Sequence, residues 1–260
     1  MLEWILRGLR KGRTTTSYPR RALEPPDGYQ GPVRLLHAAD ASPDLAAICP
    51  TGAIAVDSGG GLSLDRGRCI HCGACVRAAP ERFAFTRQYE TAARSREALI
   101  QIGQTGEADR EESTRRSLGQ QARALRRSIH VRHIDTGSDG SEEWEIQSLW
   151  NPYYDIQRLG FFLTSSPRHA DILIVTGAVT GPMRGPLERT WNVMPAPKAL
   201  IAAGTEACSG GLTGLTGLTA GGVDGILPVD VYVPGSPPPP IALLDGLLLA
   251  VGLLGVQVPR

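Results

Sequence analysis

The chain has 260 residues, with 27 Lys and Arg, 26 Asp and Glu, and a net charge of +1. This length allows two modest domains. The near-neutral charge gives no electrostatic basis for binding nucleic acid, and an aromatic content of 5% leaves few side chains to stack on bases.

Residues 1–36 are predicted to form an N-terminal docking arm. Apolar side chains recur on one face of a possible helix over residues 1–12, with basic side chains elsewhere. The helix could pack on its own domain, dock on a partner or lie on a membrane, and a partner is favoured over direct contact with lipid. The apolar run is too short for a secretory signal, so a cytoplasmic location with reduced thiols is expected.

Cysteine spacing predicts an iron–sulfur module over residues 37–86. The run C-I-H-C-G-A-C at 69–75 has C-x2-C-x2-C spacing, which in two-cluster bacterial ferredoxins is completed by a remote Cys-Pro such as the one at 49–50. A zinc site is the alternative, but zinc motifs usually space their thiols differently. His71, inside the motif, is expected to face solvent. The predicted ligands of one [4Fe–4S] cluster are Cys49, Cys69, Cys72 and Cys75.

A second cluster of the same module is predicted to be absent. Its ligand positions follow from the same spacing and cross-ligation, and none carries a thiol. Random loss would more often leave a mixture, so we expect that one whole cluster was lost. The four positions are Ala39, Ser42, Leu45 and Ala79.

Residues 87–128 are expected to be a charged linker or helix, and residues 129–260 an α/β domain. Strands are predicted in SIHVRHID, ADILIVTG, KALIAAG and GILPVDVYVPG, with helices between them, which indicates a parallel sheet. The loops after these strands are the usual sites. No segment is long and apolar enough to span a membrane, and the apolar stretch 241–258 is expected to be a buried helix.

Two long regions resemble known proteins. Residues 1–105, with GRTTTSYPRRALEPPDGYQGPVRL and YETAARSREAL, resemble the ferredoxin-like subunit of formate hydrogenlyase-type, energy-converting [NiFe] hydrogenases. Residues 129–255, with NPYYDIQRLG, SPRHADILIVTGAVT and MPAPKALIAAGT, resemble the small subunit of the same complexes, whose family includes the 20 kDa subunit of NADH–quinone oxidoreductase. The resemblance implies a fusion of two subunits, with an α+β ferredoxin-like module followed by an α/β flavodoxin-like domain with a parallel sheet.

The resemblance also implies a [4Fe–4S] cluster in the small subunit, but its four cysteine positions hold other residues here. Oxygen ligands suit such a cluster poorly, so this proximal cluster is expected to be absent. The carboxylates could hold a hard cation instead, although a salt-bridged pocket without metal is favoured. Cys208 does not replace a lost ligand and is expected to be a buried apolar residue. The degenerate positions are Asp139, Glu142, Glu206 and Ser236.

The function implied is an electron-transfer and scaffold subunit of a membrane-associated hydrogenase-like or complex I-like oxidoreductase. Its partners would be a hydrogenase-like large subunit and membrane subunits, which would hold it peripherally on the cytoplasmic face of the cell membrane. No catalytic residue can be assigned, so the chain has no complete active site of its own. The alternatives are a redox-inactive structural or coupling subunit, and a quinone-reducing protein like the 20 kDa respiratory relative.

Overall fold

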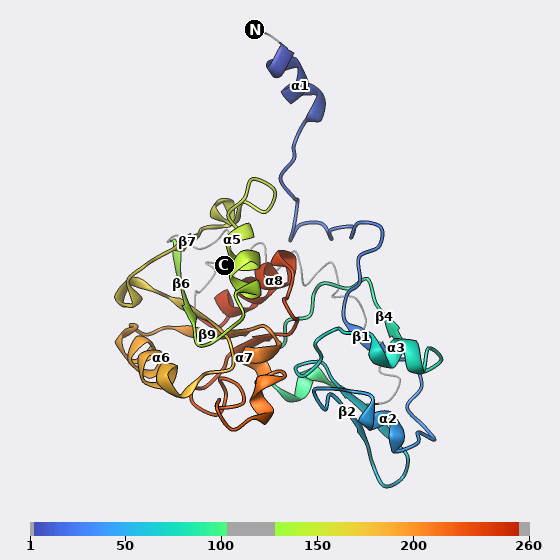
Figure 1. Ribbon diagram of the computed structural model, residues 1–260. Coiled ribbons are helices and arrows are strands. Elements are labelled where there is room, and N and C mark those ends of the chain that lie inside the picture. The colour runs from blue at the N-terminus through green and yellow to red at the C-terminus, as the bar shows by residue number, and fades with distance from the viewer. Residues whose placement is uncertain (1–2, 103–127, 255–260) are drawn as a thin grey trace.

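The computed structural model describes residues 3–102 and 128–254. A smaller N-terminal part, built on short antiparallel sheets, lies beside a larger α/β domain (Figure 1). The helix predicted in the charged region from 103 onward falls outside the described residues.

The α/β domain is built on a parallel sheet, as predicted. Its strand order is β10-β9-β8-β6-β7. Read from β7 and numbered within the domain, this order is 2-1-3-4-5, the order of flavodoxin-like folds, with the switch point between β6 and β8. One strand, β7, was not predicted; it is short and pairs with the start of β6. The five strands are β6 (Ile129–Asp135), β7 (Phe161–Leu163), β8 (Ile172–Thr176), β9 (Ala199–Ala203) and β10 (Val231–Val233).

Helices cover both faces of this sheet, which is why β9, and β8 up to Thr176, are apolar runs. Alternate strand side chains pack on one face against α5 and α8, and on the other against α6 and α7. Gly246 lets α8 approach β10 closely, because a Cβ there would collide with Val233. The helices are α5 (Ser141–Ser148), η2 (Ile156–Leu159), η3 (Pro167–His169), α6 (Gly181–Val193), α7 (Thr205–Ser209), η4 (Thr213–Leu215) and α8 (Pro240–Val251).

The N-terminal part has two small sheets around a core of its own. β1 pairs with β4, and β3 lies between β2 and β5, all antiparallel. Val33, Leu62, Leu64 and Phe83 are buried in this core, so the structured unit includes strands on both sides of residues 37–86. Its elements are β1 (Val33–Leu35), α2 (Asp44–Ala47), β2 (Ile54–Val56), β3 (Leu62–Asp65), α3 (Ala74–Ala78), β4 (Phe83–Phe85), η1 (Glu97–Leu99) and β5 (Ile100–Ile102).

Buried contacts join the two parts. Ala93 forms an isolated bridge with Tyr232 of β10. Leu99 belongs to the core beneath one face of the large sheet. Tyr18 is fully buried in the core on the other face, where its carbonyl accepts a hydrogen bond of 2.7 Å from Nη2 of Arg158. Segments from the N-terminal part therefore complete the packing of the α/β domain on both faces.

Helix α1 (Glu3–Lys11) stands away from the rest of the molecule (Figure 1). None of its residues is buried. The chain returns to the body at Thr16, whose amide donates to the carbonyl of Tyr153 at 2.8 Å. Among the helices of the described ranges, none combines the length and apolarity needed to cross a bilayer.

Candidate functional site

Four of the five cysteines line a single hollow in the N-terminal part. Cys49 lies two residues after α2, Cys69 and Cys72 lie in the loop that enters α3, and Cys75 lies in α3 itself. The remaining lining residues are apolar or small, apart from Thr51. The structure therefore brings together the four thiols that the spacing singled out, Cys49, Cys69, Cys72 and Cys75.

The loop around the hollow turns sharply. His71 and Gly73 both adopt positive φ angles, of 53° and 70°. A Cβ on Gly73 would lie 3.1 Å from the ring of Phe85, so a larger residue would be both strained and crowded. The expectation that His71 faces solvent is wrong. Its Nε2 atom is buried without a hydrogen-bond partner among the described residues, and burial lowers the pKa of the imidazole.

The chemistry of the hollow suits a thiolate-bound cationic centre. Burial, together with the charges of the three neighbouring thiols, raises the pKa of Cys69 to about 12. Burial raises the pKa of Cys75 as well. Uncompensated thiolates would be unstable here, whereas an iron–sulfur core supplies the positive charge they need. The backbone N–H of Ala53 already points at Cys49 Sγ, at 3.2 Å, the kind of contact that tunes such clusters.

An iron–sulfur cubane requires a different arrangement of ligands from a site for a single metal ion. Within the described residues, no group of three or more His, Cys, Asp or Glu side chains is arranged to hold one metal ion. In a cubane each thiolate binds a different iron at a different corner, so the four sulfurs need not converge on one point.

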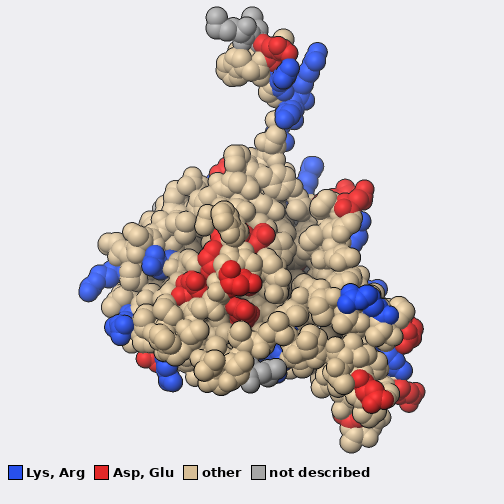
Figure 2. Space-filling model, in the orientation of Figure 1, with Lys and Arg blue, Asp and Glu red and all other residues tan. Residues whose placement is uncertain are grey.

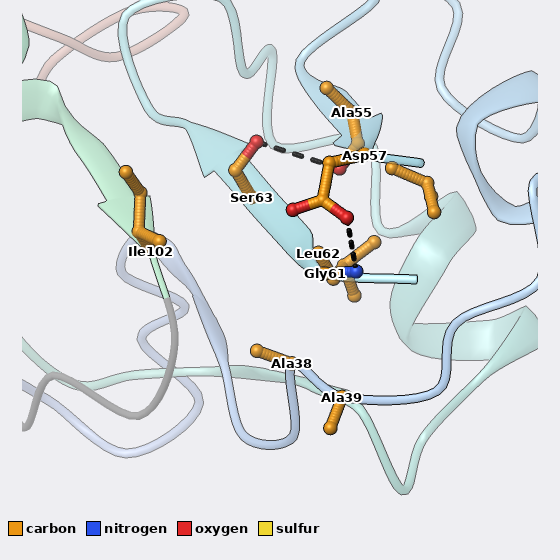
Figure 3. A pocket seen from close by; sticks show the side chains of 9 residues that line it. Ala38, Ala39, Ala55, Asp57, Gly61, Leu62, Ser63 and Ile102 are labelled. Atoms are coloured by element: carbon orange, nitrogen blue, oxygen red, sulfur yellow. Dashed lines mark hydrogen bonds between the residues drawn. The ribbon is translucent and has the colours of Figure 1, made fainter. Parts of the chain in front are cut away.

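At the positions of the second cluster, the structure has ordinary packing and hydrogen bonds. Ala79 is buried and Leu45 packs against the same core. Ala39 lines an open groove of about 450 Å³ whose other labelled side chains are mostly small or apolar (Figure 3). The Arg82 guanidinium donates to the carbonyl oxygens of Ala39 at 2.7 Å and Asp40 at 3.0 Å. These two hydrogen bonds fix the loop at residues 39–40 to Arg82.

The four positions that the resemblance predicts to be degenerate gather at the carboxyl edge of the large sheet. Figure 2 shows acidic side chains clustered on this face of the α/β domain. Glu142 is 2% exposed, and its carboxylate lies against Gly204, where a Cβ would be 2.5 Å from Oε1. Glu206 follows two residues later on α7. The carbonyl of Gly235 accepts a hydrogen bond of 2.7 Å from the amide of Thr205, which places the exposed Ser236 beside the same helix.

Hydrogen bonds organise the loop before α5. Asp139 Oδ1 accepts from the amide and hydroxyl of Ser141, at 2.9 and 2.6 Å. These bonds lower the pKa of Asp139. Asp139 therefore stabilises the turn that leads into α5.

Glu142 and Glu206 lack the cation partner that was expected. Neither forms an ion pair with a described residue, and Glu206 Oε2 is buried without a hydrogen-bond donor. Burial and the charge of Glu142 raise the pKa of Glu206 to about 7, and burial raises the pKa of Glu142. The expectation of a salt-bridged pocket is therefore wrong for Glu142 and Glu206. The negative charge of this acidic pair is reduced by protonation.

This pair makes stability depend on pH. The raised pKa of Glu206 means that the folded state holds a proton that the unfolded state releases. Stability should therefore fall as pH rises from about 4.5 to about 7, by about 1–2 kcal/mol because solvent reaches part of this side chain. The Glu206→Gln variant should lose most of this slope in urea unfolding measured across that range. An unchanged slope would show that Glu206 is not the titrating group.

A polar network that sequence reasoning missed lies at the switch point. The Thr176 hydroxyl, at the end of β8, donates to Glu143 Oε1 at 2.5 Å. Nε2 of His133 lies 3.0 Å from that hydroxyl and 3.3 Å from Glu143. The Thr176 hydroxyl donates its only proton to Glu143. Nε2 of His133 must therefore be protonated and donate to the Thr176 oxygen. The signal that could have found this network is a polar residue at the carboxyl end of a buried strand.

The cysteine hollow and the acidic edge meet at α7. The Thr205 hydroxyl is fully buried and donates to the carbonyl of Cys69 at 3.0 Å. Glu206 is the next residue along the chain. The two candidate sites are therefore neighbours across the boundary between the two parts.

Replacing Thr205 tests this contact. The Thr205→Val variant keeps the shape but leaves the Cys69 carbonyl without its donor, which should lower the free energy of unfolding by about 1–2 kcal/mol. Iron content should stay at the wild-type level, because the Cys69 thiol is untouched. Parallel measurement of urea unfolding and bound iron checks both parts, and loss of iron without loss of stability would contradict this account.

Fold and site define an α/β protein of the flavodoxin-like class, whose sheet edge abuts a hollow lined by four cysteines. The chain belongs to the family described as NADH ubiquinone oxidoreductase, 20 Kd subunit, whose model matches residues 140–250. It is similar to a probable membrane-bound hydrogenase subunit, mbhJ, of Pyrococcus furiosus, at 38% identity over 54% of this chain and 84% of that protein.

Two further relatives match over a smaller share of their length. Formate hydrogenlyase subunit 7 of Escherichia coli is 44% identical over 52% of this chain, and the match spans 52% of that subunit. An NADH-quinone oxidoreductase subunit of Desulfovibrio desulfuricans is 42% identical over 40% of this chain and 56% of that protein. The relatives are thus subunits of hydrogenase or complex I-like assemblies, and the chain spans about half of the first of them.

Proposed function

We propose that this chain is an electron-transfer and scaffold subunit of a membrane-associated, hydrogenase-like complex. It carries one [4Fe–4S] cluster in a ferredoxin-like module fused to a small-subunit domain that lacks its proximal cluster. The observation that carries the proposal is the single hollow lined by four cysteines from two segments. Its partners are a hydrogenase-like large subunit and membrane subunits, which keep it at the cytoplasmic face of the membrane.

Each part of the chain has a defined task in this proposal. The cluster, when bound, accepts and releases one electron. Cys49, Cys69, Cys72 and Cys75 hold it, and the tight loop with Gly73 sets their spacing. The Cys69 carbonyl and Thr205 form the boundary that an electron would cross toward the α/β domain.

The absent proximal cluster is supported by the state of its four positions. Glu142 is buried against Gly204, so its carboxylate occupies space at the sheet edge. Asp139 is engaged with Ser141, and Ser236 is exposed. Oxygen ligands match iron–sulfur clusters poorly, so this edge serves as an acidic docking face in the proposal.

Iron and sulfide analysis of the anaerobically reconstituted chain, with EPR after reduction, tests the proposal. About four irons and one spectral species per chain are expected for one cubane. About eight irons would mean that the sheet edge also holds a cluster. A chain that binds no iron would remove the electron-transfer role.

A second candidate is a redox-inactive structural or coupling subunit. The acidic pair Glu142 and Glu206 favours it, because it stands where relatives would continue an electron route. This candidate predicts a cluster that binds but is not reduced when the assembled complex turns over. Quinone reduction is less favoured, because it requires a cluster near the quinone at this edge.

A further inference from the structure

Helix α1 is an amphipathic element with no partner in the described structure. Ile5, Leu6 and Leu9 fall on one side at helical spacing, and they are 40%, 54% and 75% exposed. Trp4, at the border of this side, is 72% exposed. A helix this short is not stable alone in water, so its apolar side calls for a surface to cover it.

Positive charge is concentrated on the same segment. Residues 3–13 contain Arg7, Arg10, Lys11 and Arg13 against the single acid Glu3, in a chain whose total net charge is only +1. Glu3 is paired with Arg7 at 2.7 Å. Figure 2 shows the blue side chains of this arm projecting beyond the body. The arm is therefore basic while the rest of the molecule is slightly acidic.

We propose that α1 lies on an anionic lipid surface. Ile5, Leu6 and Leu9 enter the boundary between headgroups and acyl chains, while Arg10 and Lys11 contact headgroup phosphates. A protein groove would use the apolar side and leave the basic side in water. An anionic bilayer uses both sides at once, which is why the charge pattern favours lipid over a protein partner.

The base of the arm fits this orientation. Thr15 donates to the carbonyl of Pro152 at 2.9 Å, and Thr16 donates to Tyr153 at 2.8 Å. Tyr153 is 41% exposed and stacks edge-on against Tyr154. Tyrosines favour the interface between water and membrane, so the body would present this tyrosine pair toward the bilayer. The contact does not involve the cysteine hollow and is independent of the proposed cluster.

Vesicle sedimentation of the full chain tests the proposal. Wild-type protein should bind phosphatidylcholine vesicles that contain phosphatidylglycerol, bind pure phosphatidylcholine far less, and be released by salt. The double variant Arg10→Glu/Lys11→Glu should bind at least about thirtyfold more weakly. Leu9→Glu should also lose binding. The matched control Arg168→Glu/Arg189→Glu, which alters two arginines of the α/β domain far from the arm in sequence, should bind like wild type.

Trp4 offers a second readout. Its fluorescence should shift to the blue on binding, and the shift should vanish in Trp4→Phe. Wild-type protein that ignores anionic vesicles overturns the proposal, as does equal binding to pure phosphatidylcholine or unchanged binding by both arm variants. Capture of the arm by a purified large subunit without any vesicle binding would also overturn it and assign α1 to a protein partner.

Discussion

Replacing Cys69 with alanine should abolish most of the iron bound by the reconstituted chain. A cubane needs four thiolates, and a buried alanine offers no ligand in place of the lost one. The wild-type content should be about four irons per chain, and the Cys69→Ala variant should retain only a small fraction of it. The characteristic EPR signal of the reduced cluster should disappear in parallel.

The matched control is Cys208→Ala. Cys208 is as buried as Cys69, at 1% against 8% exposure, and its Sγ lies 3.6 Å from the carbonyl of Ala202 in the core of the sheet domain. Both variants lose one buried thiol, so they carry similar folding costs. Only the cluster distinguishes them. Full iron in Cys69→Ala, or equal loss in both variants, would exclude the proposed ligand set.

The central strands of the α/β domain could be predicted from the sequence, because both faces of the sheet are buried. The runs ADILIVTG and KALIAAG contain β8 and β9, because strands between two helical layers are mostly apolar on both faces. The strand predicted in GILPVDVYVPG is shorter than its apolar pattern. Pro228 cannot donate to a ladder, and Asp230 uses its carboxylate to accept the Leu200 amide at 2.8 Å, so β10 begins only at Val231.

The grouping of the four cysteines in one hollow was also predictable, because they lie in one short motif plus one Cys-Pro. Spacing within a tight loop brings Cys69, Cys72 and Cys75 together, whereas Cys49 reaches them through the fold of the module. The environment of that loop was not predictable. His71 is half-buried because of how the surrounding segments pack, and no local pattern carries that information.

The acidic edge shows the same division. The positions of Asp139, Glu142 and Glu206 followed from resemblance, but their partners did not. Sequence reasoning supplied a cation to balance them, whereas the structure leaves Glu206 with a pKa of about 7 and no ion pair among the described residues. The distance between a carboxylate and the nearest arginine is a property of the whole fold.

Replacing Tyr18 should destabilise the protein more than any other single change at the junction. Its ring is fully buried, and its hydroxyl lies 3.0 Å from Glu90 Oε1 and 3.1 Å from Asp245 Oδ1. Asp245 is itself fully buried in α8. Tyr18→Phe should lower the free energy of unfolding by about 1–3 kcal/mol, because a buried carboxylate loses a donor. Tyr18→Ala should cost about 3–5 kcal/mol, because the ring leaves a cavity.

The difference in unfolding free energy between Tyr18→Phe and Tyr18→Ala separates the contribution of the hydroxyl from that of the ring. Urea unfolding followed by circular dichroism gives both values, and Tyr153→Phe, at a tyrosine that is 41% exposed, should change stability by less than about 0.5 kcal/mol. Tyr18 links the segment after α1 to Glu90 of the N-terminal part and to α8. Its loss should therefore make the two parts unfold in separate steps, whereas a single cooperative transition in Tyr18→Ala would show that other contacts suffice to couple them.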